Sequence, residues 1–266
     1  MKSPKVEPRI RSVYADDSAC EIDGRKHTLL GALAFQDDAA VIAKMLNCKA
    51  GVGLGPNDEI KWNSKKYPRE QRELISNAVM PILQSGKGFL VVHESGKQAA
   101  AIAMASQISD YCRAVESPGF VCHFDREIIT DSRTFDSHAY SLSPPCAGWS
   151  EMDSAHSQLI QCADLFVGFQ KLKIDIGTGR VDPQKPIQWK RDDGHLGPTE
   201  LSFHLFASFR YSLWGKDEVV HWAQIDDLAH MKTNLGYGLR IFSSVSEKAI
   251  NDATAHLRRD YMGCIH

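Results

Sequence analysis

The sequence predicts a mixed α/β fold, and three features of the first half of the chain predict it. The turn signal Asp23-Gly24 separates two apolar stretches and indicates an antiparallel hairpin over residues 11–35. Residues 89–93 and 120–124 are short, almost continuous apolar runs, which are typical of strands covered on both faces. An Ala-rich helical segment lies between them at 98–115, and the order strand, helix, strand predicts a parallel crossover.

Three further helices are expected around this sheet. A helix over about 38–49 follows from Asp37-Asp38, because acidic residues stabilise the positive end of the helix dipole. A second helix is predicted over 67–84, where apolar residues recur at helical spacing. A third, over about 154–175, carries an apolar stripe made of Leu159, Cys162, Phe166 and Phe169.

These elements divide the chain into three parts. Residues 1–10 are expected to form a loose polar arm, and residues 11–175 the α/β domain. Residues 176–194 contain Gly, Pro and charged residues and are predicted to be a loop or linker. The remainder is rich in aromatic residues, so 176–266 is predicted to be a linker followed by a mainly helical C-terminal extension.

Composition excludes several classes of protein. Of the 266 residues, 31 are Lys or Arg and 33 are Asp or Glu, which gives a net charge of −2 and excludes a uniformly basic nucleic-acid coat. No run of 18 apolar residues is present, so no membrane span is expected. The N-terminus lacks the apolar middle of a signal peptide, and the seven cysteines have no zinc or redox spacing. We therefore expect a reducing, cytoplasmic location.

The familiar chemical motifs are absent from the sequence. Gly51-Val52-Gly53-Leu54-Gly55 has the wrong spacing for a dinucleotide fingerprint and follows a helix rather than a strand. Neither a P-loop, a His-Glu-x-x-His site, a zinc-deaminase pattern nor a Gly-x-Ser-x-Gly elbow is present. Nucleotide-binding loops of these kinds and serine or zinc hydrolase sites are therefore not predicted.

What remains is a set of acidic residues at the ends of buried elements. They close the first strand, lie in the glycine-rich loop, close the strand 120–124 and project from the helix 154–175: Asp16, Asp17, Glu59, Asp125, Glu127 and Asp164. Asp164 shares one side of its helix with Gln158 and Gln161, opposite the apolar stripe. Taken alone, this side is what an ordinary surface helix would show to solvent.

Taken together, the acids favour a metal site. Converging carboxylates repel one another and a divalent cation relieves that repulsion. Oxygen ligands without thiolates or paired histidines favour Mg²⁺ or Mn²⁺. Two such ions about 3.5–4 Å apart stabilise both the attacking and the leaving oxygen of an in-line phosphoryl transfer.

Four short motifs resemble those of a bacterial family known as domain of unknown function thirty-eight hundred. Its opening strand ends Asp-Glu-Ser-Gly, where this chain has Asp16-Asp17-Ser18-Ala19. Its Glu-Leu-Lys element resembles Glu59-Ile60-Lys61, its strand-end Asp resembles Asp125, and its Gln-Leu-Ala-Asp resembles Gln161-Cys162-Ala163-Asp164. Asp153-Ser154 is similar to an Asp-Ser that often precedes the last motif.

The resemblance covers residues 11–175 and implies an RNase H-like mixed sheet flanked by helices. It implies a metal-dependent nuclease or phosphodiester hydrolase that binds Mg²⁺ or Mn²⁺ through four catalytic and metal-ligating residues: Asp16, Glu59, Asp125 and Asp164. Asp16 takes the position of the family's Asp, and successive strand side chains point to opposite faces. Reserve ligands are Asp17, Glu127 and Asp153.

Basic residues behind Glu59 suggest a nucleic-acid partner. Lys61, Lys65, Lys66 and Arg69 are candidates to hold backbone phosphates. The alternative is a solvated helix start, balanced in part by neighbouring acids. Two other functions stay open at this point: a non-catalytic RNase H-like binding or scaffold module, and a hydrolase of small phosphoesters or glycosides that uses paired carboxylates.

Overall fold

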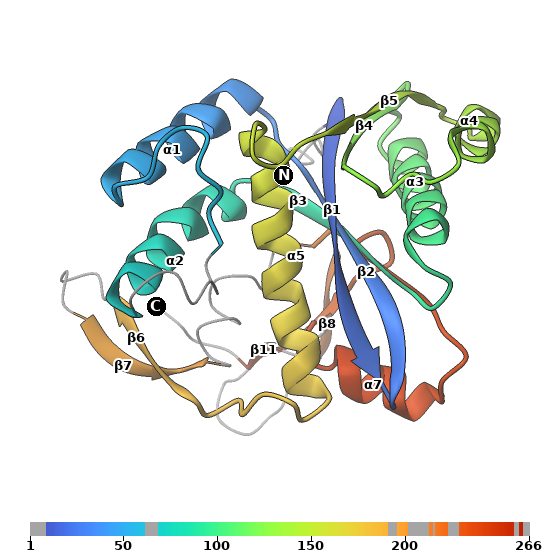
Figure 1. The fold of residues 1–266 in the computed structure, drawn as a ribbon. Coiled ribbons are helices and arrows are strands. Elements are labelled where there is room, and N and C mark those ends of the chain that lie inside the picture. The colour runs from blue at the N-terminus through green and yellow to red at the C-terminus, as the bar shows by residue number, and fades with distance from the viewer. Residues whose placement is uncertain are drawn as a thin grey trace, which may run out of the picture.

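The computed structural model describes residues 9–61, 69–190, 196–201, 213–214, 216–222, 229–257 and 261–262. Nearly all of the expected arm, 1–10, therefore lies outside the described residues. A six-stranded sheet in the order β10-β3-β2-β1-β4-β5 forms the centre of the molecule, with helices against both faces (Figure 1). The predicted mixed α/β sheet flanked by helices is confirmed.

The predicted hairpin is formed by β1 (Ser12–Ile22) and β2 (Arg25–Ala34), which are antiparallel. Asp23 and Gly24 both have positive φ, 51° and 74°, as a tight two-residue hairpin turn requires. The strands are longer than expected. Asp16 and Asp17 therefore lie in the middle of β1, paired with Gly31 and Leu30, rather than at its end.

The other strands extend the sheet on both sides of this hairpin. β4 (Phe120–Asp125) is parallel to β1 and to the edge strand β5 (Cys146–Met152). β3 (Lys87–His93) is antiparallel to β2, and β10 (Leu239–Phe242) is parallel to β3. The pairing of β1 with β4 ends at Ala15 and Phe124, so these two strands separate immediately beside Asp16.

Two hydrophobic cores lie on opposite faces of the sheet. One contains residues of α1 (Asp38–Gly51), α2 (Arg69–Gln84), α5 (Gln158–Gly177) and α7 (Glu247–Thr254). The other contains residues of α3 (Lys97–Ala114) and α4 (Ser132–Ser141). In Figure 1 α5 lies across the front of the sheet, while α3 and α4 stand to the right.

Helix α5 is buried on nearly all sides, so the interpretation of its polar side as solvent-facing is wrong. Gln158 and Gln161 are buried together with the apolar stripe. Two glycines let α5 approach the sheet closely: a Cβ on Gly31 would lie 2.9 Å from Val167 Cβ, and one on Gly88 would lie 2.3 Å from Phe166 Cζ. The missing side chains therefore set the depth at which α5 sits.

We expect Gly88→Ala to destabilise the fold, because its Cβ would collide with the ring of Phe166 in a packed core. Overpacking of this kind costs about 1–3 kcal/mol. The matched control is Gly148→Ala on β5, where a Cβ would meet nothing within 4 Å. Chemical denaturation of both variants measures the difference. Equal stability of the two variants would show that α5 is not held at this depth by glycine.

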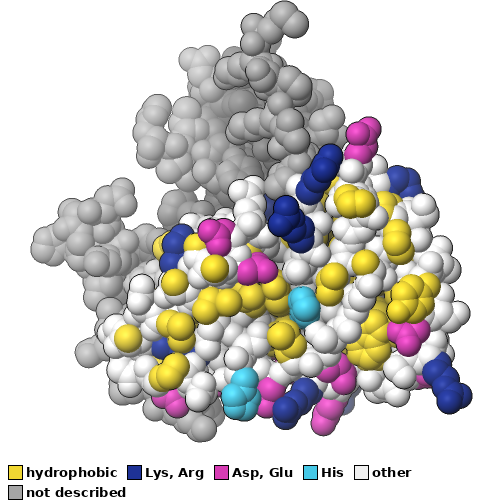
Figure 2. Space-filling model, turned by 90° about the horizontal axis from the view of Figure 1, so that it is seen from above, with side chains coloured by type: hydrophobic (Ala, Val, Ile, Leu, Met, Phe, Trp, Pro, Cys, Tyr) yellow, Lys and Arg dark blue, Asp and Glu magenta, His cyan; other side chains and the backbone are white. Residues whose placement is uncertain are grey.

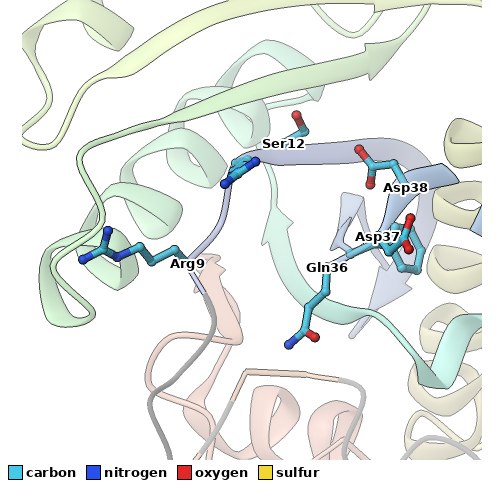
Figure 3. Close-up of a pocket in the computed structure, with 7 residues that line it drawn as sticks. Arg9, Ser12, Gln36, Asp37 and Asp38 are labelled. Carbon is cyan, nitrogen blue, oxygen red and sulfur yellow. The ribbon is translucent and has the colours of Figure 1, made fainter. Parts of the chain in front are cut away.

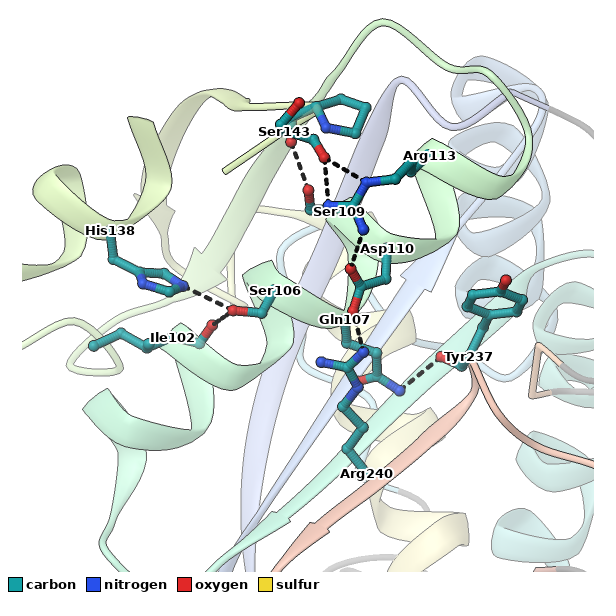
Figure 4. A network of polar contacts seen from close by, with 11 residues as sticks. Ile102, Ser106, Gln107, Ser109, Asp110, Arg113, His138, Ser143, Tyr237 and Arg240 are labelled. Atoms are coloured by element: carbon teal, nitrogen blue, oxygen red, sulfur yellow. Dashed lines mark hydrogen bonds and ion pairs between the residues drawn. The ribbon is translucent and has the colours of Figure 1, made fainter. Parts of the chain in front are cut away.

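The C-terminal region differs from the expected helical extension. Its described part contains one helix, α7, and several strands: β6 (Pro186–Lys190), β7 (Leu196–Glu200), β8 (Lys216–Trp222), β9 (Ala229–Asn234), β10 and β11 (Tyr261–Met262). β6 and β7 pair with each other, and β8, β9 and β11 form a small sheet. Because β10 hydrogen-bonds to the edge of β3, and its Arg240 pairs with Asp110 of α3 (Figure 4), part of this region belongs to the central sheet. Many of the aromatic residues of this region, Phe203, Phe206, Phe209 and Tyr211 among them, lie outside the described residues.

Among the described residues, no helix is both long enough and apolar enough to cross a bilayer.

Candidate carboxylate site

Three of the four predicted carboxylates lie on the α5 side of the sheet or on α5 itself. Side chains alternate along β1, and Tyr14 belongs to the core on the α5 side, so Asp16 faces α5 as well. On β4 the ring of Phe124 faces the opposite core, which places Asp125 on the same side as Asp16. Asp16 and Asp125 each follow directly after the last paired residues, Ala15 and Phe124. The two carboxylates therefore lie next to each other where the strands separate.

Asp164 completes this group from α5, three residues before the Val167 that packs on Gly31. Gly31 is the β2 partner of Asp16. The close approach of helix and sheet at this glycine therefore brings α5 down beside the first carboxylate.

The electrostatics reflect this proximity. Burial, followed by the charges of Asp164 and Asp125, raises the pKa of Asp16 to about 8. Burial also raises the pKa of Asp164 to about 6, against the opposing effect of Lys61 and with further raising by Glu59 and Asp125. Burial raises the pKa of Asp125 as well. At neutral pH bound protons therefore neutralise part of the negative charge of this group.

Ser154 links the fourth carboxylate to the others. Its hydroxyl Oγ donates a 3.0 Å hydrogen bond to Glu59 Oε1, and its backbone N–H donates a 3.1 Å bond to Asp125 Oδ1. A single residue in the turn between β5 and α5 therefore connects the loop that carries Glu59 with the end of β4. Sequence reasoning did not assign Ser154 a role, although the Asp-Ser resemblance pointed to the position.

Gln161 fixes the same loops from α5. Its side-chain amide Nε2 donates to the backbone oxygen of Ser154 over 2.7 Å, and its Oε1 accepts from the backbone N–H of Ile60 over 3.4 Å. Gln158 Nε2 donates to the backbone oxygen of Pro56 over 3.0 Å. The polar side of α5 is thus occupied by loop backbone. The loop that bears Glu59 is held beside Asp164 for this reason.

Two of the three reserve ligands, Asp17 and Asp153, have ion-pair partners of their own. Asp17 points to the other face of the sheet and its carboxylate lies 2.9 Å from Lys97 Nζ. Asp153 lies 2.9 Å from the guanidinium of Arg126 and 3.4 Å from Nδ1 of His156. Glu127 follows β4 in a turn with a positive φ of 65°. Lys97, which sequence reasoning missed, is the first residue of α3 and carried no signal of its own.

Of the basic residues predicted to bind phosphates, Lys61 is described in full, and its Nζ lies 3.1 Å from Glu59 Oε2. Lys65 and Lys66 lie outside the described residues, as does the side chain of Arg69. Figure 2 views the molecule from above, and on that face Lys and Arg side chains alternate with Asp and Glu. The described part of this face is of mixed charge rather than a basic patch.

The donor chemistry of the group fits a hard cation, since its four carboxylates offer only oxygen. In the described ranges, however, no three His, Cys, Asp or Glu side chains stand close enough together to hold a metal ion as they are. Glu59 is engaged by Ser154 and Lys61. To bind a cation, the carboxylate side chains would have to change rotamer, and Glu59 would have to leave Lys61 and contact the ion instead.

The likeness of this chain to known proteins is weak. No protein-family model matches the sequence, and none of the curated proteins matches it. Among solved structures, the chain is similar to a chain in the structure of the PCNA:RNase HII complex from Archaeoglobus fulgidus. The two chains share 13% sequence identity with a TM-score of 0.32, and the alignment covers 70% of this chain and 100% of the other.

Proposed function

We propose that the protein is a metal-dependent nuclease or phosphodiester hydrolase of RNase H-like architecture. The observation that carries the proposal is the adjacency of Asp16, Asp125 and Asp164, whose pKa values are all raised. Burying three carboxylates together costs stability unless a ligand or bound protons offset the repulsion. Such a cost is typical of a functional site rather than of a structural one.

In this proposal Asp16, Asp125 and Asp164 hold Mg²⁺ or Mn²⁺, with Glu59 as the fourth ligand. The bound cations would supply electrostatic stabilisation of the attacking and leaving oxygens. Asp16 must lose its proton to act as a ligand, and its pKa of about 8 makes cation binding weaker as the pH falls. Lys61, released from Glu59, would be free to pair with a phosphate oxygen of the substrate.

Cleavage of unstructured DNA and RNA by the full chain tests the proposal. With Mg²⁺ or Mn²⁺ we expect products from at least one of the two polymers, and none in excess EDTA. Cleavage that continues in EDTA, or no cleavage of either polymer at any pH from 6 to 9, would contradict it.

Ser154 is expected to act as a positioning residue for Glu59. Ser154→Ala removes the 3.0 Å bond from Oγ to Glu59 but keeps the backbone bond to Asp125. Loss of a partner that orients a metal ligand typically lowers metal affinity by about 10–100-fold. Titration calorimetry with Mn²⁺ measures this affinity.

The control for this change is Ser141→Ala, which removes an exposed hydroxyl that donates to the backbone oxygen of His138. We expect wild-type Mn²⁺ affinity in the control, and unfolding free energies within about 1 kcal/mol of wild type in both variants. Unchanged affinity in Ser154→Ala would mean that Glu59 is not a ligand or needs no support.

One observation favours a second candidate, the non-catalytic scaffold module. Two acids of the region already have ammonium partners, since Lys61 pairs with Glu59 and Lys97 with Asp17. A site neutralised in this way has less need of a cation. Calorimetry separates the two functions: the scaffold predicts no Mn²⁺ uptake at millimolar concentration, and the nuclease predicts uptake at one or more sites.

A further inference from the structure

A cavity of about 540 Å³ lies at the start of β1, apart from the carboxylates, and its size is that of a small-ligand site. Its lining comes from both ends of the hairpin and from the start of α1: Arg9, Arg11, Ser12, Phe35, Gln36, Asp37 and Asp38. Figure 3 shows Arg9 on one side of the cavity, Asp37 and Asp38 on the other, and Ser12 between them. One end of the cavity is therefore cationic, and the other end offers hydrogen-bond acceptors.

The two ends differ in how far they are already engaged. Within the described ranges, no ion pair involves the guanidinium of Arg9 or of Arg11. Asp37 Oδ1 accepts the backbone N–H of Ala40, and Asp38 Oδ2 accepts the hydroxyl of Tyr14 over 2.6 Å. Each carboxylate keeps an oxygen for a donor of a ligand, whereas the guanidinium groups are free for an anion.

This cavity opens on the same face of β1 as the carboxylate site. Ser12, Tyr14 and Asp16 alternate along the strand and so share one side. Between the cavity and Asp16 lies the ring of Tyr14, which stacks on His123 of β4 at a centroid distance of 4.9 Å. Ser12 precedes Asp16 by four residues, or about 13 Å of extended strand, which is a few nucleotides of a bound polymer.

We propose that this cavity binds one nucleotide of a single-stranded nucleic acid whose neighbouring segment enters the carboxylate site. Arg9 and Arg11 hold a phosphate, because guanidinium groups pair with phosphate oxygens in two-point geometry. The ring of Phe35 offers a surface for a base to stack on. Gln36 and Asp38 accept from the exocyclic amine of adenine or cytosine, a group that thymine lacks. This inference rests on the proposed nuclease function for its choice of a polymer.

Binding of fluorescein-labelled deoxytetranucleotides to the full chain in EDTA tests the inference without any cleavage. We expect dC or dA tetramers to bind about fivefold or more tightly than dT tetramers, because a paired amine is worth about 1 kcal/mol or more. Arg11→Gln should weaken binding about tenfold, since it removes a charge-assisted hydrogen bond. Gln36→Ala should reduce the preference for dC and dA over dT.

The matched control is Arg133→Gln, which removes an exposed guanidinium on α4 outside the cavity and should change the affinity less than twofold. Because tetranucleotide binding is measured in EDTA and cleavage is measured with metal, the inference can fail while the nuclease proposal stands, and the reverse. Equal effects of Arg11→Gln and Arg133→Gln would overturn the inference. Competition by inorganic phosphate as strong as that by the tetramers would also overturn it, because it would show an anion site without base recognition.

Discussion

Asp164→Asn is expected to abolish metal-dependent cleavage while the protein stays folded. The amide keeps the size of the side chain but removes a negative ligand from the centre of the carboxylate group. A catalytic metal contributes several kcal/mol to the stabilisation of a transition state, so we expect the rate to fall about a thousandfold or more. Cleavage of the best polymer substrate under saturating Mn²⁺ measures the loss.

The variant should also be more stable against unfolding than the wild-type protein. Burial is the largest cause of the raised pKa of Asp164, and replacing its carboxylate with an amide removes both this burial cost and the repulsion with Asp16 and Asp125. Circular dichroism and thermal unfolding provide the check that the loss of activity is chemical. Asp182→Asn, in the exposed loop after α5, is the matched control and should cleave like the wild type. Wild-type rates in Asp164→Asn would remove this residue from the site.

The second large effect concerns stability against pH in the absence of metal. The pKa of Asp16 is raised from 3.8 to about 8, so the folded state binds a proton that the unfolded state releases between these values. Because the folded state holds more protons there, the free energy of unfolding falls as pH rises from about 4 to 8. Below about pH 4 Asp16 is protonated in both states, and the unfolding free energy no longer depends on pH through this residue.

Asp16→Asn should remove this dependence. Each unit of pKa shift corresponds to about 1.4 kcal/mol, and with allowance for relaxation of the site we expect the variant to be more stable than wild type by roughly 2–5 kcal/mol at pH 8. At pH 4 the two proteins should differ little. Urea titrations in EDTA across this range measure the difference, with Asp23→Asn in the exposed hairpin turn as control. A constant difference between Asp16→Asn and wild type at all pH values would mean that folding does not raise the pKa of Asp16.

Local signals in the sequence predicted much of the fold because their effect does not depend on distant residues. Asp23-Gly24 specified the hairpin turn, and the side chain of Asp37 caps α1 by accepting from Ala40. Elements without such signals were missed, among them α4 and β5. α4 is short and polar, and β5 is an edge strand that is partly exposed and contains Gly148. Because most residues of β5 are exposed or half-buried, the strand lacks the apolar run that marked β3 and β4.

The site shows the same division between local and distant information. Periodicity placed Asp164, Gln161 and Gln158 on one side of a helix, and that geometry is confirmed. Periodicity does not show what packs against that side of the helix. In the structure it is the loop backbone at Ile60 and Ser154 rather than water. The roles of Ser154 and Lys97 likewise depend on tertiary contacts between elements far apart in the chain. That the carboxylates act as metal ligands stays a prediction.

Anomalous scattering from crystals soaked in Mn²⁺ tests the metal site most directly. The nuclease proposal predicts at least one anomalous peak in direct contact with carboxylate oxygens of Asp16, Asp125 and Asp164, and a shift of Glu59 away from Lys61. Crystals saturated with Mn²⁺ at pH 8 or above that show no peak among these three side chains would contradict it.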